Sequence, residues 1–76
     1  MITIKFFASL REEVGKTEVQ IEADKQLTVA ETWNKVCADI PLPTHVLMAI
    51  NMEYANLNAI VKDGDEVAFF PPVTGG

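Results

Sequence analysis

Hydrophobic and polar residues alternate in three segments of the chain, 2–7, 17–23 and 66–70, and strict alternation predicts β-strands that each bury one face. The inward-facing positions of these strands are Ile2, Ile4, Phe6, Val19, Ile21, Val67 and Phe69. The same phase leaves Phe7 and Phe70 on the outer face, among polar residues. These two aromatic side chains are therefore candidates for contact with another molecule.

A helical pattern follows the second strand. Thr28 and Glu31 stand in the sequence Thr-Val-Ala-Glu, a capping box in which both side chains satisfy free amides at a helix start. Apolar residues then recur at spacings of four, three and four, which predicts a buried helix stripe made of Val29, Trp33, Val36 and Ile40. The helix has to end by Ile40, because Pro41 cannot continue it. Segment 9–14, followed by Gly15, predicts a second, short helical turn.

The remaining segments have weaker patterns. Residues 24–27 are predicted to form a polar connection, and the apolar run 46–51 predicts a further strand. Residues 62–65, Lys-Asp-Gly-Asp, predict a turn. Segment 52–59 is predicted to be irregular, with apolar anchors in and beside it at Tyr54, Leu57 and Ile60.

The order of these elements predicts an α+β domain, with a mixed sheet of four or five strands packed on one main helix. The first and last strands are expected to lie side by side at the centre of the sheet. Phe7 and Phe70 would then form a hydrophobic patch near the point where the C-terminal segment leaves the domain. We predict a domain over residues 1–70 and an extended, flexible tail over residues 71–76.

The C-terminal sequence Pro71-Pro72-Val73-Thr74-Gly75-Gly76 is suited to enter the active site of another protein. The two prolines cannot extend a sheet and favour a stiff, extended exit. Glycine has no Cβ, so Gly75 and Gly76 fit a narrow passage and leave the terminal carbonyl open to attack. From Pro71 an extended tail reaches roughly 20 Å. The alternative is an end that merely frays, but the apolar run leading into the glycines favours the first interpretation.

Composition excludes several classes of function. A chain of 76 residues makes one domain, which is too small to spare core for an enclosed active-site cavity. Six basic against eleven acidic residues give a net charge of −5, which repels phosphate backbones and argues against nucleic acid as a partner. Apolar runs are short and no signal-peptide pattern opens the chain, so we expect a cytoplasmic protein without membrane contact.

One cysteine and one histidine offer little for catalysis or metal binding. Cys37 lies in the helical pattern, and free cysteines are mostly buried, so a packing role is predicted for it. His45 has no Cys or His partner at metal-ligand spacing. We therefore predict no metal site, no bound cofactor and no free-standing enzyme.

Three stretches of the chain occur together in a known family. They are residues 6–12 (Phe-Phe-Ala-Ser-Leu-Arg-Glu), residues 63–73 (Asp-Gly-Asp-Glu-Val-Ala-Phe-Phe-Pro-Pro-Val) and the terminal Gly75-Gly76. In this combination the chain resembles the MoaD family, the small, sulfur-carrying subunit of molybdopterin synthase. The match runs through the whole chain in order, and the C-terminal stretch is its most specific part. The resemblance implies the ubiquitin-like β-grasp fold.

The resemblance also implies a chemistry for the tail. In that family a ubiquitin-activating-type adenylyltransferase uses ATP to adenylate the terminal glycine, here Gly76, and a sulfur donor protein supplies the sulfur of a thiocarboxylate. The tail enters the large synthase subunit and gives sulfur to a cyclic pyranopterin precursor during molybdenum cofactor biosynthesis. By this resemblance the chain is a sulfur carrier within a heterotetramer and not an enzyme on its own, and ATP is used by the activating partner.

Partner contacts are implied around the first and last strands and the start of the tail. They comprise Phe7, Arg11, Tyr54, Phe70, Pro71, Pro72 and Val73. Two residues depart from the family pattern. Tyr54 stands where an aliphatic residue is common, and Met52 replaces a small or polar turn residue.

Three other interpretations stay open. A sulfur carrier for thiamine thiazole shares the fold and the Gly-Gly end, but it lacks the Phe-Phe-Pro-Pro run found at 69–72. One sequence alone does not distinguish a sulfur carrier for tRNA thiolation from the small subunit of molybdopterin synthase. A ubiquitin-like interaction module would use the sheet face alone, and deletion of Gly76 would leave its function intact.

Overall fold

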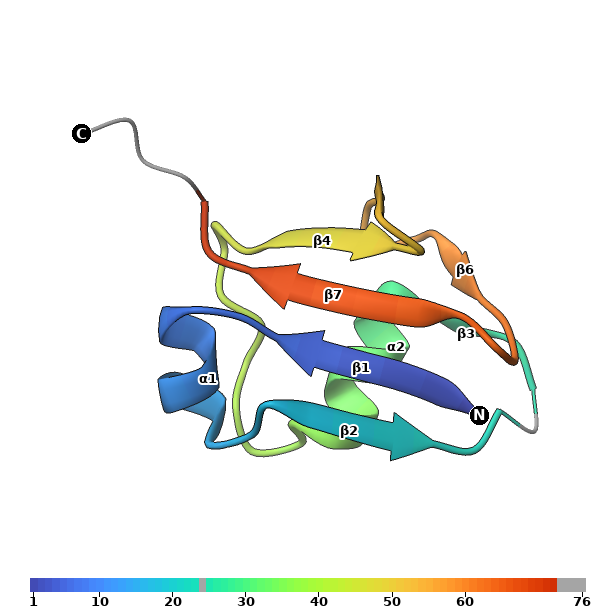
Figure 1. Ribbon diagram of the computed structural model, residues 1–76, viewed down its shortest axis with the longest axis horizontal. Helices are drawn as coiled ribbons and strands as arrows, with labels where there is room; N and C mark the ends of the chain where they lie inside the picture. The colour runs from blue at the N-terminus through green and yellow to red at the C-terminus, as the bar shows by residue number, and fades with distance from the viewer. Residues whose placement is uncertain (24, 73–76) are drawn as a thin grey trace.

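A five-stranded mixed sheet dominates the computed structural model, which describes residues 1–23 and 25–72 (Figure 1). β1 pairs in parallel with β7 and antiparallel with β2, and β4 continues the sheet from β7 to β5. The predicted α+β class and the adjacent, central first and last strands are confirmed. The strands are β1 Ile2–Phe6, β2 Glu18–Ile21, β4 Leu47–Ile50, β5 Glu53–Tyr54 and β7 Glu66–Phe70.

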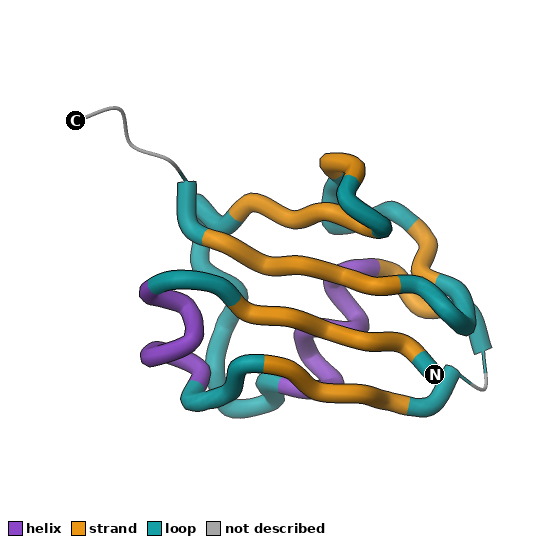
Figure 2. Tube along the Cα trace, viewed as in Figure 1, coloured by secondary structure: helices purple, strands orange, loops and turns teal. Residues whose placement is uncertain are grey.

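The main helix, α2 (Val29–Val36), covers the inner face of the sheet (Figure 2). The predicted capping box is present, because Glu31 N–H donates to Thr28 Oγ1 over 3.1 Å and Thr28 N–H donates to Glu31 Oε1 over 2.8 Å. Hydrogen bonds from the Thr28 backbone and side chain hold the pKa of the Glu31 carboxyl below its ordinary value. The local sequence alone therefore fixes where this helix begins.

The helix ends four residues before Ile40, which the sequence pattern had placed on the helix stripe. Cys37 leaves the helical region with φ −122° and ψ 53°, and its N–H donates to the Trp33 carbonyl over 2.7 Å. Ile40 still packs against the core, and its carbonyl accepts a hydrogen bond of 2.8 Å from Trp33 Nε1. The indole therefore closes the loop after the helix as well as filling the core.

The short helix α1 (Ser9–Val14) lies at the end of the sheet where β1 and β7 finish (Figure 1). It buries Leu10 and Val14, the two apolar residues that the pattern predicted to share a face. Gly15 ends the helix in the left-handed conformation, with φ 77°, and its N–H donates to the Arg11 carbonyl over 2.9 Å. The predicted short helical turn and its glycine stop are confirmed.

Three aromatic rings form the centre of the core. Trp33 lies edge-on to Phe6 and Phe69, with ring centroids 5.8 Å and 5.0 Å away, and the two phenylalanines stack at 5.9 Å. All three side chains are almost fully buried. Because Phe6 belongs to β1, Phe69 to β7 and Trp33 to α2, this cluster joins both ends of the chain to the helix.

Several short elements differ from the prediction. Residues 24–27 were predicted to be a connection only, but β3 (Leu27–Thr28) pairs antiparallel with β6 (Ile60–Val61) to form a second, two-stranded sheet. Segment 52–59, predicted to be irregular, contains β5. The expectation that Tyr54, Leu57 and Ile60 are apolar anchors is wrong, because all three are exposed and Val61 is the buried residue. Two-residue strands are too short to show a hydrophobic period.

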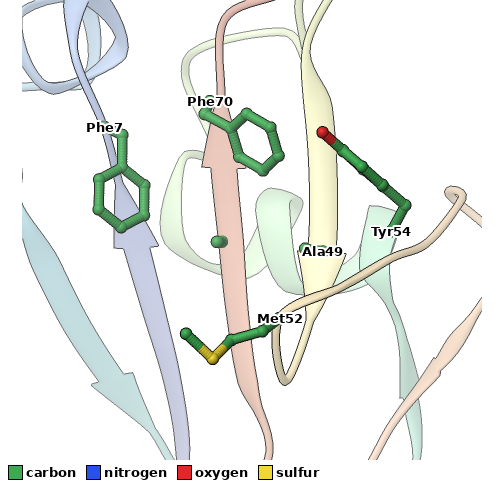
Figure 3. Close-up of a pocket in the computed structure, with 6 residues that line it drawn as sticks. Phe7, Ala49, Met52, Tyr54 and Phe70 are labelled. Atoms are coloured by element: carbon green, nitrogen blue, oxygen red, sulfur yellow. The ribbon is translucent and has the colours of Figure 1, made fainter.

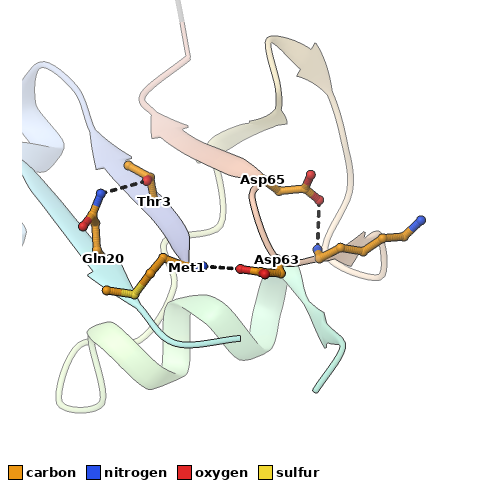
Figure 4. A network of polar contacts seen from close by, with 6 residues as sticks. Met1, Thr3, Gln20, Asp63 and Asp65 are labelled. Atoms are coloured by element: carbon orange, nitrogen blue, oxygen red, sulfur yellow. Dashed lines mark hydrogen bonds and ion pairs between the residues drawn. The ribbon is translucent and has the colours of Figure 1, made fainter. Parts of the chain in front are cut away.

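A polar network fixes the turn that precedes β7, and Figure 4 draws the one of its bonds that joins Lys62 to Asp65. The Asp65 carboxylate accepts hydrogen bonds from the Lys62 N–H over 2.9 Å and from Asn51 Nδ2 over 3.0 Å. Asn51 Oδ1 in turn accepts from the Glu66 N–H over 3.0 Å. These bonds, first that from Lys62 and then that from Asn51, lower the pKa of Asp65. The network ties the start of β7 to the turn between β4 and β5.

We expect Trp33→Ala to lower the free energy of unfolding by about 3–5 kcal/mol, because it opens a cavity at the centre of the core. Urea denaturation measures this change. Trp33→Phe keeps a ring but loses the hydrogen bond to Ile40, so its loss should be smaller. An alanine variant as stable as the original chain would show that the helix stripe does not hold the core together.

We expect Asp65→Asn to lower stability at neutral pH, because an amide has only one acceptor oxygen for the two donors that face Asp65. The lowered pKa of Asp65 means that its contribution is complete above the ordinary pKa of aspartate, about 4, and is lost as the pH falls through the folded value. The variant should therefore lose less stability on acidification, measured by thermal melts across that range. Asp39→Asn makes the same change in charge at an exposed site and is the control for a general effect of charge on stability.

Candidate docking face

The outer face of the sheet carries an apolar hollow of about 260 Å³ near the end of β7 (Figure 3). Phe7 and Phe70 both line it, so the predicted meeting of these two side chains on one face is confirmed. Tyr54, a predicted contact residue, lines it as well. The complete lining consists of Phe7, Ala49, Met52, Tyr54, Ala68 and Phe70. These six residues are called the docking face below.

Two alanines form the floor of the hollow. Ala49 on β4 and Ala68 on β7 are register partners, so their small side chains lie side by side on the outer face. Lys5 on β1 and Tyr54 on β5 continue the same row on either side. The hollow exists because two methyl groups stand between larger side chains, which leaves room for a side chain from another molecule.

Aromatic side chains form the walls. Phe7 follows the last residue of β1, is 45% exposed, and its N–H donates to the Phe69 carbonyl over 3.1 Å. Phe70, the last residue of β7, is half-buried, and its ring lies 6.0 Å from the ring of Tyr54. Tyr54 is itself 79% exposed. An exposed apolar surface of this kind, lined by aromatic residues, is typical of a protein contact site.

Met52 overhangs the hollow from the turn between β4 and β5. Its side chain extends across β7, as Figure 3 shows, and it is 93% exposed. Both residues of the turn have positive φ, 50° for Asn51 and 71° for Met52. That backbone conformation suits asparagine and glycine and is unfavourable for methionine.

A charged border separates the hollow from the rest of the outer face. The Lys5 ammonium group lies 3.2 Å from Glu66 Oε1 and 4.0 Å from Glu18 Oε1, so one cation is shared by two carboxylates. This border leaves an excess of negative charge beside the apolar surface. A partner with basic residues around an apolar protrusion would complement it.

Not all of the predicted contact residues belong to the docking face. Arg11 is exposed on α1 and does not line the hollow. Pro71 and Pro72 border a separate groove between α1 and the loop before β4, lined also by Ser9, Leu10, Glu13, Pro43, Thr44, His45 and Val46. Val73, Gly75 and Gly76 lie outside the described residues, as does most of the predicted tail 71–76.

Cys37 is buried in the core, which confirms its predicted packing position. Burial raises the pKa of its thiol, which disfavours the reactive thiolate. Within residues 1–23 and 25–72, no group of three or more His, Cys, Asp or Glu side chains is placed to hold a metal ion. None of the helices described is long and apolar enough to cross a membrane.

Three residues that line the hollow were not among the contact residues predicted from the sequence. Ala68 shares the outward phase of Phe70, so the alternation in β7 contained the signal, but alanine is not a typical contact residue. Ala49 lies in a continuous apolar run that has no phase to read. Met52 was noted only as an unusual turn residue, because its reach over the sheet depends on how the hairpin folds.

Comparisons with known proteins agree with this architecture. The model of the ThiS family matches residues 4–76. The chain is 40% identical to the molybdopterin synthase sulfur carrier subunit of Haemophilus influenzae and 39% identical to that of Escherichia coli K12, each alignment covering 100% of both chains. The crystal structure of SAMP1 from Haloferax volcanii superposes with a TM-score of 0.77 at 31% identity, over 99% of this chain and 98% of that one. The chain therefore belongs to the ThiS family, in its MoaD-like group of ubiquitin-like β-grasp proteins.

Proposed function

We propose that this chain is the sulfur carrier subunit of a molybdopterin synthase, with Gly76 as the residue that carries the sulfur. The observation that supports this most directly is full-length similarity to subunits of that name, together with a sequence ending in Gly-Gly. The docking face adds physical support. It lies at the end of β7, and the chain continues from Phe70 directly into Pro71, Pro72 and the terminal residues.

The proposed reaction begins with activation of the C-terminal carboxylate. A carboxylate is a poor electrophile, so its oxygen attacks the α-phosphate of ATP, pyrophosphate leaves, and a mixed anhydride with AMP forms on Gly76. A ubiquitin-activating-type adenylyltransferase performs this step. Sulfur at the oxidation level of sulfide, supplied by a donor protein, then displaces AMP and leaves a thiocarboxylate. Glycine suits both steps, because a side chain at this position would crowd the attacked carbonyl.

Sulfur transfer takes place in the large synthase subunit under this proposal. The thiocarboxylate is nucleophilic on sulfur and attacks a carbon of the cyclic pyranopterin precursor held there, and the oxygen substituent on that carbon leaves. Water then hydrolyses the resulting thioester, so the sulfur stays on the pterin and Gly76 regains its carboxylate. The small chain brings the reactive group and a docking surface, while the large subunit brings the active site. The described residues are consistent with an active site on the large subunit. Their one cysteine is buried, and their one histidine borders the groove beside Pro71.

A second candidate function also begins with activation of the terminal glycine, but the activated glycine then reacts differently. The likeness to SAMP1, a small archaeal modifier protein, favours a chain whose terminal glycine is joined to another protein. Both functions require adenylation of Gly76. They differ in whether sulfur or the amine of a target protein displaces AMP.

We expect the intact mass of the chain to increase by the difference between sulfur and oxygen after incubation with a ubiquitin-activating-type enzyme, ATP and a sulfur source. The control is a variant that lacks Gly76, which should keep its fold and show no increase. A covalent adduct with another protein in place of that increase would support the modifier function. An unchanged mass, with an enzyme that activates the Escherichia coli relative, would contradict both.

We expect Phe70→Ala to weaken binding to the large synthase subunit at least tenfold, about 1.4 kcal/mol, because it removes a wall of the docking face. The free energy of unfolding should change by less than about 1 kcal/mol, since the side chain points outward. Phe69→Ala is the matched control. Its side chain is fully buried, so it should lower stability by about 3–5 kcal/mol. A Phe70 variant as destabilised as the Phe69 variant would show that the outer face serves the fold and not a partner.

A further inference from the structure

We propose that Met52 is a specificity-determining contact for the large synthase subunit, a role that rests on the function proposed above. The turn between β4 and β5 holds this residue in an unfavourable conformation so that its side chain overhangs the hollow. The large subunit would insert an apolar side chain onto the floor formed by Ala49 and Ala68. Met52 would pack against it.

The backbone of the turn is the first argument. Ile50 pairs with Glu53, so Asn51 and Met52 form a two-residue loop in which both residues have positive φ. Hairpin loops of this kind favour Asn followed by Gly, because glycine adopts the second conformation without a steric penalty. Asn51 fits that preference and Met52 opposes it. Strained backbone at a non-glycine residue is concentrated at sites that bind or react.

Burial does not explain the methionine. Met52 is 93% exposed, so its side chain contributes little apolar contact to the fold of the free chain. A residue that costs stability in its backbone and regains almost none in its packing has no structural reason to be there. Contact with a second molecule would supply the missing compensation.

The position of the side chain is the second argument. Met52 lines the hollow together with Phe7 and Phe70, although it comes from the opposite side of the sheet face (Figure 3). Methionine is unbranched and has a polarizable thioether, so it adjusts its shape to an incoming side chain. The hollow therefore has three aromatic walls, formed by Phe7, Phe70 and Tyr54, and one adaptable wall, which is the part that can select between partners.

The residues beside the hollow favour the large synthase subunit as the partner that fills it. Phe70 leads directly into Pro71, so a protein that receives the C-terminus has to cover this part of the sheet. The curated relatives are named as subunits of a synthase, and a lasting subunit contact needs a buried apolar centre more than a transient one does. The carboxylates of Glu18 and Glu66 at the border suit a partner with basic residues around that centre.

The test is to titrate the purified large subunit with the intact chain and with Met52→Gly, and to record a thermal melt of each free chain. The substitution creates the Asn-Gly pair that the turn favours, so the melting temperature should rise by about 3 °C. Affinity for the large subunit should fall about tenfold. Opposite changes in stability and affinity are the signature of a residue that is retained for binding.

Two further variants serve as controls. Ile60→Ala removes another exposed apolar side chain that does not line the hollow, and should leave the affinity unchanged. Met52→Leu keeps an apolar side chain over the hollow and should retain most of the affinity. If Met52→Leu bound as weakly as Met52→Gly, the adaptable thioether itself would be the contact, which also supports the proposal.

The remaining outcomes overturn it. Equal affinity of Met52→Gly and the intact chain would show that Met52 makes no contact. A fall in both affinity and melting temperature would show a structural role. Loss of affinity for the adenylyltransferase alone would assign the contact to the other partner. If the intact chain itself did not bind the large subunit, the proposed function would fail first and this inference with it.

Discussion

The parallel pairing of β1 with β7 is the constraint on which the rest of the structure depends. It places Phe6 opposite Phe69 in register, and Trp33 of α2 packs edge-on against both rings. Strands alternate in side-chain direction, so the residues that follow these two phenylalanines have to face the other way. The contact that closes the core therefore also brings Phe7 and Phe70 together outside it. Core and docking face are two sides of the same strand pair.

Small residues and strained turns complete the docking face. Ala49 and Ala68 leave a hollow where larger side chains would have made a flat surface, and the turn at Asn51 and Met52 bends an adaptable side chain over it. The hydrogen bonds that Asn51 makes with the Asp65 carboxylate and with the Glu66 N–H hold this turn against the start of β7. Flat, featureless sheet faces offer little selectivity, so a hollow with an adaptable wall is better suited to the recognition of one partner than an ordinary sheet would be.

A domain of this size has little core to spare for an enclosed catalytic cavity, and its cysteine is buried in the core while its histidine borders an open groove. A carrier does not need one. Under the proposed function, the chemistry belongs to a terminal carboxylate that other proteins activate and use, and the folded part has only to present that end and be recognised. The negative net charge fits this role, because it favours fast association with partners of opposite charge.

The sequence by itself determined the features that depend on local pattern. Alternation gave the phase of β1 and β7 and with it the outward direction of Phe7 and Phe70. Thr28 and Glu31 fixed the start of α2, and the family motifs identified the fold. Only the tertiary structure decided the second small sheet, the exposure of Tyr54, the separate groove at Pro71 and Pro72, and the reach of Met52. These features depend on strand register and turn geometry between distant segments, and a two-residue strand or a single turn residue carries no period from which they could be predicted.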